Sequence, residues 1–152
     1  MASNRHLGRI VALQTLYEYE FRTEVGDKNL DYATILQRNL AEYRSSVDDV
    51  DFVDKLVGGV LSAQEQLDEK LKPLAPEWPI DQLSRVDRAV LRIGLYELLY
   101  CADTVPPKVV INEAVELAKA FGSDNSGKFV NGVLGTALRT LVEESDNENK
   151  QL

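Results

Sequence analysis

Basic side chains near the N-terminus form the first group that could bind a ligand. Arg5 and Arg9 stand four residues apart with His6 between them, and no acidic residue occurs before Glu18. On a helix this spacing puts both arginines on one face, at the end where the helix dipole disfavours a cation by roughly 0.3–1 kcal/mol. Such an arrangement is typical of a small patch that contacts phosphates. A solvated helix end is the alternative, and the residues alone leave both interpretations open.

A second group lies in residues 122–132, which read GSDNSGKFVNG. The small polar residues predict a helix start, whose free backbone N–H groups favour phosphates. On that helix Lys128 and Asn131 share an outward face, and Phe129 lies at its edge. An aromatic ring beside a lysine can stack an unpaired base, as in many sites for single-stranded RNA. The alternative is that Phe129 belongs to the core, because apolar residues at helical spacing are usually buried.

Charged residues within a strongly apolar stretch form the third group: Asp87, Arg88, Arg92 and Glu97. Glu97 shares a face with apolar residues, and a buried carboxylate is costly unless it is paired. We therefore expect structural pairing for most of these charges. Asp87 falls in the first turn of the expected helix and should be exposed enough to meet a partner.

The small numbers of histidine and cysteine residues exclude several kinds of functional site. The chain has one histidine, His6, and one cysteine, Cys101, so a zinc site and an internal disulfide are not expected. No nucleotide-binding or nucleophile motif accompanies them, and we expect no catalytic residue, no metal, no cofactor and no small-molecule substrate. The single cysteine and the lack of a signal or membrane-spanning segment predict a soluble, cytoplasmic protein.

Net charge limits how nucleic acid could be bound. The formal net charge is −8, which argues against coating nucleic acid through bulk positive charge. A local basic site remains compatible with that balance. RNA binding would then be weak alone, sensitive to salt or helped by a second protein.

The elements that must position these residues are helices. The chain has 152 residues, 44% of them hydrophobic, which suits one domain with a real core. Apolar residues recur at helical spacing and almost nowhere alternate, so the predicted fold class is all-α. Three prolines in residues 73–79 predict a linker between two halves. A polar, acidic tail at residues 146–152 is expected to be disordered.

Three motifs in order make the sequence recognisable. R-x-x-x-R and ALQTLYEYE stand in residues 5–20, DRAVLRIGLYELL in residues 87–99, and INEAVELAKAFG in residues 111–122, followed by S-x-x-FVNGVL in residues 126–134. Together they resemble the NusB antitermination factors over essentially the whole chain before the tail. Any one motif is only moderately specific, whereas all three in order are strongly specific.

The resemblance implies a fold and a function. It implies a single NusB-like domain at residues 1–145 with about seven helices, arranged as two small packed bundles at about 1–75 and 79–145. It implies binding of the boxA element of nascent ribosomal RNA together with the ribosomal protein NusE, in an antitermination complex on elongating RNA polymerase. It further implies that the protein has no cofactor and no enzymatic activity.

Site residues follow from the resemblance position by position. The protein-partner surface of the family maps onto Tyr17 and Asp87. Between the cations this chain has Leu7 and Gly8, where many family members have a denser arginine run, so intrinsic RNA affinity is expected to be lower, with more reliance on NusE. The RNA-contacting residues of the family map onto Arg5, His6, Arg9, Asn125, Ser126, Lys128, Phe129 and Asn131.

Two other functions remain as alternatives. One is a protein–protein scaffold with no RNA role, which the acidic balance slightly favours. The other is the accessory RNA-binding domain of a ribosomal RNA methyltransferase, since NusB-like domains precede such enzymes. This chain has no cofactor-binding half and is not expected to methylate RNA alone.

Overall fold

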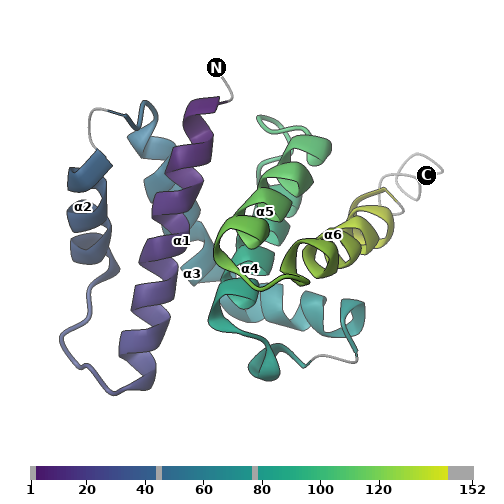
Figure 1. The fold of residues 1–152 in the computed structure, drawn as a ribbon, viewed down its shortest axis with the longest axis horizontal. Coiled ribbons are helices and arrows are strands. Elements are labelled where there is room, and N and C mark those ends of the chain that lie inside the picture. Colours follow the sequence, from purple (N-terminus) through teal and green to yellow (C-terminus); the bar gives the residue numbers. More distant parts are fainter. Residues whose placement is uncertain (1–2, 44–45, 77–78, 144–152) are drawn as a thin grey trace. The chain divides into compact units, whose positions relative to one another are not determined.

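A computed structural model describes residues 3–43, 46–76 and 79–143 (Figure 1). Helices dominate these ranges, and no strand occurs within them, so the predicted all-α fold with about seven helices is confirmed. None of the helices in these ranges is long and apolar enough to cross a membrane. The expected acidic tail lies outside the described residues. The α-helices are α1 (Ser3–Glu24), α2 (Tyr32–Tyr43), α3 (Val50–Leu71), α4 (Arg85–Tyr100), α5 (Pro107–Phe121) and α6 (Ser126–Ala137), joined by the short helical segments η1 (Lys72–Leu74), η2 (Ile80–Gln82) and η3 (Leu138–Glu143).

Side chains fix the starts of three helices. Asp31, Asp49 and Ser84 each accept a hydrogen bond from a backbone N–H two or three residues further along, at 3.0–3.1 Å. The first turn of a helix leaves such N–H groups without a backbone partner, and a side-chain acceptor there stabilises the helix by about 1 kcal/mol. Local sequence therefore determines where α2, α3 and α4 begin.

The chain divides into two compact units, Met1–Ser62 and Ala63–Leu152. The division falls inside α3, earlier than the proline segment at which we expected two bundles to separate. The last turns of α3 belong with the second unit because Arg92 on α4 donates to both carboxylate oxygens of Asp68, at 2.8 and 2.9 Å.

In the first unit, α1 approaches α3 closely at Gly8. A Cβ atom at Gly8 would lie 2.9 Å from Cγ2 of Val53, so only glycine permits this approach. Gly8, which stands where many family members have a denser run of arginines, thus has a packing role. It positions the start of α1, which carries the predicted basic residues.

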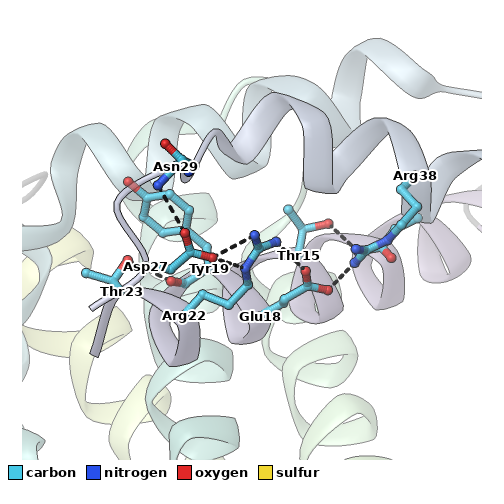
Figure 2. Close-up of polar contacts among 9 residues, drawn as sticks. Thr15, Glu18, Tyr19, Arg22, Thr23, Asp27, Asn29 and Arg38 are labelled. Carbon is cyan, nitrogen blue, oxygen red and sulfur yellow. Dashed lines mark hydrogen bonds and ion pairs between the residues drawn. The ribbon is translucent and has the colours of Figure 1, made fainter. Parts of the chain in front are cut away.

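Polar contacts tie the C-terminal half of α1 to α2 and to the turn between them (Figure 2). Figure 2 shows Arg22 between Glu18 and Asp27, to which it donates at 3.1 and 2.9 Å. Glu18 also pairs with Arg38 on α2. The hydrogen bond from Arg22 lowers the pKa of Asp27 below its ordinary 3.8.

In the second unit, α4 is the central helix. Residues 88–98 are all buried, and both α5 and α6 pack against α4 (Figure 1). Gly94 allows α6 to come close, since a Cβ atom there would lie 2.5 Å from Cδ1 of Leu134. Arg88 reaches the carbonyl oxygens of Ile80 and Asp81 at 3.5 and 3.4 Å. Arg88 and Arg92 therefore serve structural contacts, as expected for these two charges.

Candidate nucleic-acid interface

The residues predicted to contact RNA fall into two clusters, one in each unit. The N-terminal basic cluster consists of Arg5, His6 and Arg9 on the first turns of α1. The α6 cluster consists of Asn125, Ser126, Lys128, Phe129 and Asn131, at the start of α6.

The two arginines of the N-terminal basic cluster lie against one aromatic ring. The guanidinium carbons of Arg5 and Arg9 are 4.4 and 5.1 Å from the centroid of Phe52, so the predicted shared face is confirmed. Arg5 also donates to Asp49 at 3.2 Å, and its side chain is 31% exposed. A phosphate could reach Arg5 but would compete with the Asp49 carboxylate.

Arg9 differs from Arg5 in its exposure. Arg9 is only 2% exposed, and His6 is half-buried. A buried guanidinium over a ring stabilises packing through its stem and its cation–π contact. This placement favours a positioning role for Arg9, while RNA contact by Arg9 and His6 stays a prediction.

Ser126 is held inside the turn between α5 and α6. It is 2% exposed, and its Oγ accepts from the backbone N–H of Ser123 at 2.9 Å and lies 3.1 Å from the Ser123 Oγ. Gly122 makes room for this arrangement, because a Cβ atom there would lie 2.5 Å from the Ser126 Oγ and 2.7 Å from the carbonyl oxygen of Ala118. Ser126 therefore shapes the turn, and direct RNA contact through its hydroxyl stays a prediction.

Three members of the α6 cluster face outward. Asn125, Lys128 and Asn131 are exposed, and their side chains make no hydrogen bond or ion pair with the part of the chain that the structure describes. On the opposite face of α6, Val130 and Val133 are 0% and 5% exposed and belong to the core. Lys128 is thus a cation available to an incoming phosphate.

Phe129 is half-buried and lines an open pocket of about 360 Å³. We call this the Phe129 pocket; Asn125 and Ser126 also line it, and the start of α4 contributes Ser84 and Asp87. Phe129 is therefore neither a fully buried core residue nor a freely projecting one. Its ring borders a space in which a planar ligand could lie.

The pocket also contains two residues that the sequence analysis did not identify. Gln82 and Leu83 line it, and neither belongs to a recognised motif, whereas Ser123, which lines it as well, falls within the polar segment 122–132. The nearest signal in the sequence is Ser84 followed by Asp87 three residues later, a spacing typical of a helix start. That two helix starts meet in one pocket is visible only in the tertiary structure.

The residues predicted to meet a protein partner lie in different units. Tyr17 on α1 is 40% exposed, and Phe21, one turn later, is 44% exposed. Neighbouring exposed aromatic side chains are typical of the anchors of protein interfaces. Phe21 therefore extends the protein-partner surface for which Tyr17 was the predicted residue. Asp87 lies instead in the Phe129 pocket.

Known proteins match this chain over almost its full length. The model of the NusB family matches residues 6–139. The transcription antitermination protein NusB of Chloroflexus aggregans is 46% identical over 150 residues, covering 97% of this chain and 96% of that protein. The structure of T. maritima NusB matches with a TM-score of 0.79 and 32% identity, over 90% of this chain and 91% of that one. A chain in a crystal structure of the antitermination factors NusB and NusE in complex with double-stranded RNA matches with a TM-score of 0.76 and 26% identity, over 91% of this chain and 98% of that one. The motifs, the helical fold and these matches agree: the chain belongs to the NusB family.

Proposed function

We propose that this protein is a transcription antitermination factor that binds RNA together with NusE. The observation that carries the proposal is the match, over 91% of this chain, to a structure of NusB and NusE in complex with RNA. The RNA would be the single-stranded boxA element of nascent ribosomal RNA, and the complex would act on elongating RNA polymerase in the bacterial cytoplasm.

RNA contacts would come from both clusters, with different roles for their members. Lys128, which is exposed, and Arg5, which is partly exposed, contact phosphates. Phe129 stacks a base, and Asn125 and Asn131 offer amide groups to base edges. With a net charge of −8, attraction to RNA is local to these cations, and few counterions are released on binding.

NusE would bind through the exposed aromatic surface of α1. Tyr17 and Phe21 offer large apolar area with little side-chain entropy to lose, which favours their use as anchors. A second protein that adds RNA contacts of its own would also offset the repulsion between RNA and the net negative charge of this chain. That gives a physical reason for joint binding.

The protein would act by binding alone. The Phe129 pocket contains Ser84, Ser123 and Ser126, but within residues 3–43, 46–76 and 79–143 no histidine, lysine or cysteine lines it to activate a hydroxyl. A serine nucleophile needs such a base within hydrogen-bond reach. We therefore assign the pocket to recognition rather than to catalysis.

Fluorescence anisotropy with a boxA-like RNA and a scrambled RNA, each with and without NusE, tests the proposal. Tighter binding of the boxA-like RNA, strengthened by NusE, is the expected result. Equal binding of both RNAs in both conditions would reject the RNA function and leave the scaffold interpretation.

Charge variants sharpen this test. Lys128→Ala should reduce the slope of log affinity against log salt by about 0.7, the value for one lost phosphate contact on a single strand. The matched control is Lys108→Ala, which removes an exposed lysine from the first turn of α5 and should leave the slope unchanged. An unchanged slope for Lys128→Ala would remove Lys128 from the site.

A further inference from the structure

Asp87 occupies an unusual position for a carboxylate, because it lies in the pocket that we propose binds RNA. It lines the Phe129 pocket together with Phe129 and Asn125, although Phe129 follows it 42 positions later in the chain. Among the residues that the structure describes, no arginine, lysine or histidine lines the same pocket. A nucleotide whose base stacks on Phe129 would bring its phosphate close to this negative charge.

The hydrogen bonding of Asp87 is incomplete. Its backbone N–H donates to the Ser84 Oγ at 3.1 Å, which is one half of a capping box. In a complete box the carboxylate would accept in return from the backbone N–H of Ser84. Here one carboxylate oxygen of Asp87 is shielded from solvent and has no donor within the described residues.

A shielded carboxylate oxygen without a donor is an unfavourable arrangement that a ligand can relieve. A cationic N–H donor relieves it best, because it supplies both the hydrogen bond and the opposite charge. RNA supplies negative phosphates, whereas a basic side chain of a protein supplies such a donor. The local chemistry therefore favours a protein side chain as the group that meets Asp87.

We infer that the Asp87 carboxylate holds down the RNA affinity of the Phe129 pocket until a protein partner presents a basic side chain to it. The inference rests on the proposed function and specifies how RNA and protein binding are coupled. In the free protein Asp87 repels the RNA backbone. In the complex its charge is neutralised, so each ligand strengthens the binding of the other by the same factor.

Asp87→Asn tests this coupling. The amide has nearly the same shape, removes the charge and remains acceptable in the first turn of a helix. Two like charges separated by the width of such a pocket repel strongly enough to change an affinity by about 10-fold. The variant should therefore bind a boxA-like RNA about 10-fold more tightly without NusE, and NusE should strengthen that binding by a smaller factor than in the unmodified protein.

Asp103→Asn is the matched control. Asp103 is exposed in the turn after α4, at the opposite end of that helix from Asp87, and its replacement makes the same change in net charge. It should leave both the RNA affinity and the NusE factor close to those of the unmodified protein. Thermal melts should show both variants folded.

Other results would overturn the inference. Asp87→Asn could leave the RNA affinity unchanged, lower it, or raise it only as much as Asp103→Asn does. Any of these results would show that the pocket charge does not limit RNA binding. Weaker NusE binding with unchanged RNA affinity would make Asp87 a protein contact only. If the unmodified protein binds the boxA-like RNA and the scrambled RNA equally, both with and without NusE, the proposed function itself fails.

Discussion

Gly94 lies in the middle of α4, where alanine would ordinarily stabilise a helix by about 1 kcal/mol relative to glycine. The structure predicts the opposite result for Gly94→Ala. The new Cβ atom would lie 2.5 Å from Cδ1 of Leu134 and 3.5 Å from the Cβ atom of Ala114. Leu134 is 0% exposed, so its side chain cannot move out into solvent to relieve the clash.

The magnitude follows from two opposing effects. Overpacking a filled core costs about 1–3 kcal/mol, and the upper part of that range applies because Leu134 is enclosed. After subtraction of the gain in helix propensity, Gly94→Ala should lower the free energy of unfolding by roughly 1–2 kcal/mol. For a chain of this size that lowers Tm by about 2–8 °C. Urea unfolding followed by circular dichroism measures the change directly.

Gly132→Ala is the matched control on α6. A Cβ atom at Gly132 meets nothing within 4 Å, so glycine is not required there for close helix packing. Here the propensity gain acts alone, and the variant should be more stable by up to about 1 kcal/mol. The two Gly→Ala changes should therefore shift stability in opposite directions.

A double variant identifies the contact responsible. In a Leu134→Val background the side chain ends at Cγ, so the destabilisation caused by Gly94→Ala should shrink, and the coupling between the two changes measures the clash. A Gly94→Ala protein as stable as the unmodified one, or more stable, would refute the close approach of α4 and α6.

Three further predictions concern stability and the site. Arg92→Met should destabilise the fold by about 2–4 kcal/mol, because it leaves the largely buried carboxylate of Asp68 unpaired; a loss below 1 kcal/mol by urea unfolding would contradict this, and Arg92→Met/Asp68→Leu should recover part of it. Gly122→Ala should weaken RNA binding in anisotropy titrations as well as stability, because its Cβ atom would lie 2.7 Å from the carbonyl oxygen of Ala118 and displace the turn; unchanged RNA affinity would separate the turn from the site. The pKa of Asp27 is lowered from 3.8, so the stabilisation from its pair with Arg22 is present above pH 3.8 and is lost as the pH falls below that value. Lowering the pH should therefore reduce the free energy of unfolding more in the unmodified protein than in Asp27→Asn. Parallel pH profiles of the two proteins would argue against the ion pair.

Much of the fold and part of the candidate site could be predicted from the sequence. Helical periodicity, proline breaks and caps such as Ser84 are local features, so they predict the helices and their starts without knowledge of packing. The same periodicity separated the buried Val130 and Val133 from the exposed Lys128 and Asn131. The family motifs then supplied candidate roles for these residues.

The accessibility of individual site residues required the tertiary structure. Spacing put Arg5 and Arg9 on one face, and both lie over Phe52, yet only Arg5 remains open to a ligand. Ser126 likewise belongs to the recognised motif but is enclosed by its own turn.

The Phe129 pocket shows most clearly what only tertiary structure decided. By itself the sequence determined that α4 and α6 each begin with a polar segment, and that Asp87 and Phe129 stand at those two starts. It did not reveal that both residues line one pocket. The physical reason is that helix periodicity and capping depend on neighbours within about four positions. Which helix ends meet, and which charge then faces which ring, depends on packing between segments far apart in the chain.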